Sequence, residues 1–230
     1  MPFATSGAQR IHYADSGGRG PAVVFSHGFF MDQDMWDPQV EELRPTYRCL
    51  AVDARGFGLT EYDGEPFTYW DLADDIIAVM DDAGVDTAIL VGLSQGGFTT
   101  QRAAVAHPDR VRAIVLCDTD CEVETDETKP MYYGTKDALL ANGWSDDLAN
   151  AMAGMLFAPG YDASFWVERW QKNPPERIAA AGCARRCRRR DRRPGRAHRR
   201  GARSCTPSPP RPGDRRSSGG TAASRARASR

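Results

Sequence analysis

The sequence predicts an α/β protein in which helices cover both faces of a mostly parallel sheet. Three apolar runs, at residues 23–30, 50–52 and 88–91, have the composition of strands that are buried on both faces. Each run is followed by a turn that contains glycine, and then by a segment in which apolar residues recur at helical spacing. Strands that alternate with helices in this order form parallel sheets.

Other local patterns place the elements between these runs. Residues 9–15 alternate polar and apolar side chains and predict an early edge strand, and residues 35–43 predict a short helix. Thr68 can cap a helix over residues 69–82. One face of that helix is apolar and should cover the sheet; it carries Leu72, Ile76, Ile77 and Met80.

The most informative motif is Gly92-x-Ser94-x-Gly96, between a strand predicted over residues 86–93 and a helix predicted over residues 95–106. A tight turn brings strand and helix together there, so side chains at the two glycine positions would clash. The turn exposes the serine hydroxyl at a helix N-terminus, where the dipole favours developing negative charge. The motif predicts a nucleophilic serine, whereas an isolated match would equally fit a loop rich in Gly and Ser.

Two further motifs come earlier in the chain, a His-Gly pair at residues 27–28 and an Asp-x-Arg-Gly-x-Gly segment at residues 53–58. With the motif around Ser94, their order and spacing resemble the α/β-hydrolase superfamily over residues 9–178. Within it, the chain is similar to small bacterial serine esterases, enol-lactonases and cofactor-free haloperoxidases. The resemblance implies an α/β-hydrolase fold and hydrolysis of a small carboxylic ester or lactone through an acyl-serine intermediate.

The resemblance also assigns parts of the site. Ser94 is expected to be the nucleophile, and the backbone N–H groups of Phe29 and Gln95 are expected to form the oxyanion hole. Asp118 and Asp120 follow a strand predicted over residues 111–117, and one of them, with Asp118 as the first candidate, could be the triad acid. The alternative is that these carboxylates cap a helix or are solvated at a strand end. No metal or organic cofactor is implied, and the expected partner is a small apolar ester or lactone.

Residues 128–177 show an amphipathic helical pattern. In the family that the chain resembles, such an insertion is the cap over the substrate pocket, and the alternative is a set of packing helices. We therefore expect a core over residues 1–125 and a helical cap over residues 126–180. Large apolar side chains in the cap predict an apolar pocket; they are Trp144, Met152, Met155, Leu156, Phe157, Trp166 and Trp170.

The pattern breaks at residue 181. Residues 181–230 contain 17 arginines and no Val, Leu, Ile, Met, Phe, Tyr or Trp, so they cannot bury a core and are predicted to be disordered. Their net charge is +15, against −16 for residues 1–180. The resemblance implies two more strands here, followed by the triad acid and the triad histidine, so the fold is expected to lack its last strands. We hypothesise a shifted reading frame, because the codons of Arg, Pro, Gly and Ala are GC-rich.

A basic arm that binds nucleic acid through phosphates is the rival interpretation of this segment. It lacks aromatic residues to stack on bases, so nucleic acid is not the expected partner. A zinc site is also not expected, because the spacing fits no common zinc finger for Cys183, Cys187, His198 and Cys205.

The chain has four histidines, and none is placed to activate Ser94. His27 is expected to hold its own loop, His107 ends the helix after Ser94 at the far end, His12 lies in the early edge strand, and His198 lies in the Arg-rich segment. A serine without a positioned base is a weak nucleophile. The chain is therefore predicted to be inactive or nearly so, and a non-catalytic pocket protein is the alternative.

The composition favours a cytoplasmic protein. No apolar run is long enough to cross a membrane, and the first ten residues lack the basic-then-apolar order of a secretory signal. Six cysteines without a framework spacing favour a reducing compartment.

Overall fold

The computed structural model describes residues 2–121 and 129–186. Six strands form one sheet in the order β1-β2-β4-β3-β5-β6. The strands β4, β3, β5 and β6 are parallel, whereas β1 and β2 are antiparallel to their neighbours. The strands are β1 (Phe3–Ser6), β2 (Gln9–Asp15), β3 (Ala22–Ser26), β4 (Arg48–Val52), β5 (Ala88–Leu93) and β6 (Val111–Cys117).

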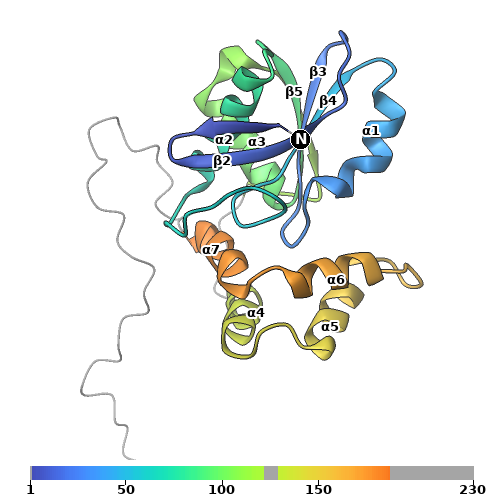
Figure 1. Cartoon of the computed structure of the whole chain (residues 1–230), viewed down its shortest axis with the longest axis vertical. Coiled ribbons are helices and arrows are strands. Elements are labelled where there is room, and N and C mark those ends of the chain that lie inside the picture. The colour runs from blue at the N-terminus through green and yellow to red at the C-terminus, as the bar shows by residue number, and fades with distance from the viewer. Residues whose placement is uncertain (1, 122–128, 187–230) are drawn as a thin grey trace, which may run out of the picture.

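Helices cover both faces of this sheet (Figure 1). Helices α2 and α3 lie on one face and α1 lies on the other, while α4 to α7 form a separate layer at one end of the strands, which we call the cap layer. No helix in the described ranges is long and apolar enough to cross a membrane. The helices are η1 (Gln33–Trp36), α1 (Asp37–Leu43), α2 (Tyr69–Asp82), α3 (Gln95–Ala106), η2 (Pro108–Arg110), α4 (Lys129–Asn142), α5 (Asp146–Leu156), α6 (Ser164–Lys172) and α7 (Pro175–Arg186).

Side chains of the central strands alternate between the two faces of the sheet, as strand geometry requires. In β3, Val24 packs in the apolar cluster that includes Ile76 of α2, whereas Val23 and Phe25 pack in the cluster that includes Trp36. Every residue of β3 is buried, because strands pair with both of its edges and helices cover both of its faces. The sheet is therefore a firm support for the loops at the ends of its strands.

The predicted fold class is confirmed, and several elements have their predicted bounds. The helix Gln95–Ala106 and the strand Val111–Cys117 are present as predicted, and Thr68 caps α2 in a reciprocal pair with Asp71. One assignment is wrong: Gln9–Asp15 is not an edge strand, because the four-residue strand β1 pairs with it and forms the edge. Four residues are too few to give a periodic signal.

Helix α7 extends into the segment that the sequence predicts to be disordered. Ala181 is fully buried, and its Cβ lies close to the backbone of Gly56. Alanine is the best helix former and its small side chain allows close packing, so the prediction is wrong for residues 181–186. The rest of that segment, residues 187–230, lies outside the described residues. The interpretation of the segment as a basic arm therefore stays a prediction. Three of the residues that could have formed a zinc site also lie there: Cys187, His198 and Cys205.

Candidate active site

The turn between β5 and α3 holds Ser94 in a strained conformation. Its φ is +49° and its ψ is −107°, which few residues with a side chain adopt. A Cβ at Gly92 would lie 2.4 Å from the backbone of Gly96, and a Cβ at Gly96 would lie 2.0 Å from the carbonyl oxygen of Ser26. The predicted steric need for glycine at both positions is confirmed. The serine side chain therefore stands at the N-terminus of α3, where negative charge is favoured.

The end of β6 holds this turn in place. The N–H of Ser94 donates to the carbonyl oxygen of Cys117 at 2.9 Å, and Thr119 Oγ1 donates to the carbonyl oxygen of Ser94 at 2.9 Å. Both polar backbone groups of Ser94 are thus engaged within the protein. Its hydroxyl is the group that remains for a ligand.

Two turns bring Gln95 and Phe29 beside the serine. Gln95 is the first residue of α3, so its N–H has no acceptor within the helix. The turn after β3 lies against Ser94, since a Cβ on Gly28 would be 4.0 Å from the Ser94 Cβ. Phe29, the next residue, lines the same pocket as Ser94. These positions suit two donors to one developing oxyanion.

The side chain of Gln95 points away from this pocket. It is 1% exposed and lines a separate cavity of about 20 Å³ together with Ser26, Asp75 and Thr99. Only the backbone of Gln95 can therefore serve a substrate.

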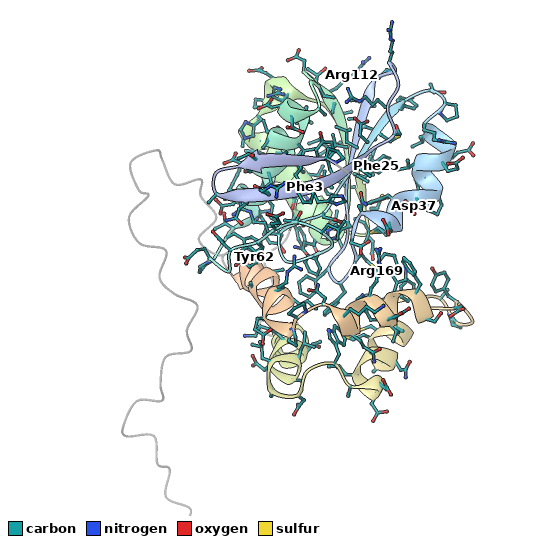
Figure 2. The ribbon with its side chains drawn as sticks, in the orientation of Figure 1. Phe3, Phe25, Asp37, Tyr62, Arg112 and Arg169 are labelled. Carbon is teal, nitrogen blue, oxygen red and sulfur yellow. The ribbon has the colours of Figure 1, made fainter. Side chains whose placement is uncertain are left out.

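The cap layer fixes the loop that carries Phe29. The neighbouring Phe30 has a φ of +70°, and its carbonyl oxygen accepts a hydrogen bond from Trp170 Nε1 at 2.5 Å. Arg169, on α6 where this helix faces the sheet (Figure 2), forms ion pairs with Asp32 and with Asp34. These contacts hold a strained loop against the sheet.

A pocket of about 420 Å³ lies in front of Ser94. Its lining is mostly apolar, as predicted. The predicted tryptophans Trp144, Trp166 and Trp170 do not line it. They pack in the cluster that joins the cap layer to Phe30, where Trp144 and Trp170 contact the Phe30 ring. The predicted residues that do line the pocket are Met152, Met155, Leu156 and Phe157.

Two ionisable side chains of the described residues line this pocket. Asp118 follows β6 with a φ of +43° and is exposed. Lys136 lies on α4 and pairs with Asp137 at 2.9 Å. The structure thus brings Ser94, Phe29 and Asp118 to one pocket. Lys136 was not predicted, because one lysine on an amphipathic helix gives no signal in the sequence.

The family profile described as the alpha/beta hydrolase fold matches residues 21–194. The chain belongs to this family. It is 29% identical over 130 residues to 3-oxoadipate enol-lactonase 1 of Acinetobacter baylyi, a match that covers 56% of this chain and 47% of the relative. The chain therefore spans about half the length of this curated relative.

Two solved structures are similar to this α/β-hydrolase. The enol-lactonase from Burkholderia xenovorans LB400 gives a TM-score of 0.72 at 28% identity, over 80% of this chain and 72% of that chain. A thermophilic esterase from Thermogutta terrifontis gives a TM-score of 0.68 at 27% identity, over 80% of this chain and 71% of that chain.

Both ring nitrogens of His27, in the His-Gly motif, are engaged in hydrogen bonds. Its Nε2 accepts from the N–H of Ala54 at 3.0 Å, so the proton of the neutral ring is on Nδ1, which donates to the carbonyl oxygen of Gly28 at 2.7 Å. Both nitrogens therefore hold loops of this α/β-hydrolase together, as predicted, and neither can take a proton from Ser94.

The other described histidines are also engaged elsewhere. His107 Nε2 lies 2.7 Å from Asp74 Oδ1, beyond the far end of α3. His12 is fully buried, and its Nδ1 donates to Asp53 Oδ2 at 2.7 Å. Burial alone would raise the pKa of Asp53, but this hydrogen bond and two backbone N–H donors hold the pKa of that carboxyl below its usual value. No described histidine is therefore available as a base for Ser94.

The loop after β4 is built around the same carboxylate. Gly58 has a φ of +50°, and a Cβ there would lie 2.1 Å from Asp53 Cγ, so only glycine fits. Arg55 makes a bidentate pair with the buried Asp75, with both distances 2.7 Å. This motif is structural in the present α/β-hydrolase.

Proposed function

We propose that this α/β-hydrolase attacks small carboxylic esters or lactones with Ser94 and forms an acyl-serine intermediate. The observation that carries this proposal is the placement of Ser94: a strained turn at a helix N-terminus, beside an apolar pocket of about 420 Å³. Relatives described as an enol-lactonase and an esterase support the same class of substrate.

The reaction follows from the groups around the serine. Ser94 Oγ bonds to the carbonyl carbon, and the carbonyl oxygen takes up negative charge. The backbone N–H groups of Gln95 and Phe29 donate to that oxygen. The oxygen of the alcohol or enol then leaves with a proton, and water cleaves the acyl-serine to a carboxylic acid.

Turnover is expected to be slow, because no described histidine can take the serine proton. Asp118 lines the pocket and is the carboxylate that could accept it, directly or through water. A carboxylate is a weak base near neutral pH. General-base catalysis is typically worth about 10²–10⁴-fold, so we expect acylation to be slower by about that factor than with a positioned imidazole.

The test is acylation by p-nitrophenyl acetate and p-nitrophenyl butyrate, followed by mass spectrometry of the peptide that contains Ser94. We expect a slow acyl adduct on Ser94 and none in the Ser94→Ala variant. An adduct on another residue, or equal ester hydrolysis by wild type and variant, would overturn the proposal.

A pocket protein without turnover is the second candidate, and the engagement of His12, His27 and His107 favours it. Its signature would be saturable binding of butyrate esters, measured by calorimetry, with no acyl adduct at any pH.

A further inference from the structure

The loop that carries Phe29 has open space on two sides. Phe30 and Met31 of this loop line the pocket of Ser94, and the same two residues line a second cavity of about 320 Å³. A chain segment beside open space has no packing contacts on that side. The position of the loop therefore depends more strongly on the specific contacts that it does make.

Both ends of the loop are held against the sheet. A Cβ on Gly28 would lie 2.7 Å from Leu93 Cδ2, so the first end fits tightly beside β5. At the other end, the N–H of Gln33 donates to Oδ1 of the buried Asp53 at 2.8 Å. Between these ends, Phe30 has a φ of +70°, which is unfavourable for a residue with a side chain. The middle of the loop would therefore relax if its own contacts were removed.

Helix α6 supplies polar contacts to the middle of the loop. Arg169 forms ion pairs with Asp32 and with Asp34, the second at 2.6 Å, and Trp170 Nε1 donates to the carbonyl oxygen of Phe30. Asp32 is buried, and a planar guanidinium suits a bridge between two carboxylates. Arg169 also lines the second cavity, so its ion pairs hold the loop from a side on which there is space.

We propose that Arg169 is a positioning residue for the oxyanion hole: its two ion pairs keep the loop, and with it the backbone N–H of Phe29, where acylation of Ser94 requires that donor. This inference rests on the proposed function. An oxyanion donor is effective at about 2.7–3.1 Å, and a misplacement of about 1 Å can cost about 10²-fold in rate. Arg169 does not line the pocket of Ser94. Its loss should therefore slow acylation without weakening the binding of the ester.

The first test is the rate of Ser94 acylation by p-nitrophenyl butyrate, followed by mass spectrometry at several ester concentrations. Arg169→Gln removes both ion pairs, and we expect its maximal acylation rate to fall by about 10–100-fold at an unchanged half-saturating concentration. Arg169→Lys keeps the charge but lacks the fork that bridges two carboxylates, so its rate should be intermediate. A merely structural role would reduce the folded fraction, measured by circular dichroism, and leave the maximal rate per folded chain unchanged.

The matched control is Lys172→Gln. Lys172 also lies on α6 and lines the second cavity, but it pairs with Glu168 of its own helix, so its loss should leave the acylation rate unchanged.

The second test does not need the reaction. Hydrogen exchange of the backbone N–H groups of residues 29–34 should become faster by about tenfold in Arg169→Gln and should stay unchanged in Lys172→Gln.

Unchanged exchange in Arg169→Gln would overturn the proposal, whether or not Ser94 reacts. So would an unchanged maximal rate in that variant, an equal loss of rate in Lys172→Gln, or a loss that appears only as weaker binding of the ester. A wild-type chain that forms no adduct on Ser94 would overturn the proposed function itself. Hydrogen exchange would then still decide whether Arg169 holds the loop.

Discussion

The β4 and β6 regions of the sheet differ in how their polar groups are satisfied. After β4, the buried carboxylate of Asp53 accepts hydrogen bonds from His12, Gln33 and Leu59. After β6, Asp118 is exposed and has no ion-pair partner within the described residues, and the apolar side chains of the strand face solvent. Stability is therefore concentrated around β4, while the groups that are open to ligands or partners gather at the end of β6.

Both regions are built from similar strands. β3, which pairs with β4, and β6 are each almost entirely apolar in sequence, yet every residue of β3 is buried and the middle of β6 is exposed. Burial of a strand is thus set by its neighbours in space and not by its own composition.

The largest difference should appear when each carboxylate is neutralised. Asp53→Asn should cost about 3 kcal/mol of unfolding free energy, because an amide cannot accept from three donors and leaves buried N–H groups unpaired. The matched change Asp118→Asn should stay within about 0.5 kcal/mol, since that side chain is exposed. Urea denaturation measures both values. Equal effects would show that the two regions do not differ as described.

Two glycine-to-alanine substitutions should also differ in their effect on stability. Gly96→Ala should cost about 1–3 kcal/mol, because its Cβ would overlap the backbone of Ser26 and force the strand and helix apart. Gly134→Ala, in an open part of α4, should stabilise by about 0.5–1 kcal/mol through helix propensity. Thermal denaturation of both variants, with circular dichroism as a check on helix content, gives the comparison. A loss of stability in both variants would contradict this prediction.

Acid should destabilise the protein mainly through the β4 region, where Asp53 is buried. The pKa of Asp53 is lower in the folded state than in the unfolded chain, so the unfolded chain binds the proton first as pH falls. The stability that Asp53 provides is therefore fully present above about pH 4 and is lost as pH falls through the folded pKa. Urea midpoints measured across this range should fall steeply for wild type and less steeply for Asp53→Asn. If the urea midpoints of wild type and Asp53→Asn fall in parallel with pH, Asp53 is not the cause of the acid sensitivity.

A smaller effect than at Asp53 or Gly96 is expected at the turn of Ser94. Ser94→Gly should stabilise the chain by about 1 kcal/mol, because glycine adopts a φ of +49° without strain. Ser94→Ala should give no such gain, since alanine keeps a Cβ in the same strained position. The difference in unfolding free energy between these two variants isolates the strain. If both variants are equally stable, the turn is not strained.

Local signals in the sequence predicted the parts of the fold that depend on neighbours in the chain. Thr68 caps α2, and the glycines around Ser94 mark the turn into α3, because capping and steric requirements are local. The His-Gly turn was found by its order relative to Ser94. These signals were sufficient for the fold class and for the residues that form one side of the pocket.

Other features depend on contacts across the fold and left no such signal. Lys136 reaches the pocket from α4, and Trp170 supports Phe30 from α6, only because the cap layer folds over the sheet. β1 is too short to show the alternation of polar and apolar residues that marks a strand. The helical continuation through Ala181 depends on space beside Gly56. Composition alone cannot report such packing.

The most direct test of the central claim is the pH dependence of Ser94 labelling by a fluorophosphonate. The claim is that Ser94 is presented for attack without an imidazole to activate it. We expect labelling of Ser94, absent in Ser94→Ala, with a rate that rises steadily with pH and shows no inflection near the histidine pKa of about 6.5. An inflection there would reveal a histidine base, and a complete lack of labelling at every pH would show that the serine is not presented at all.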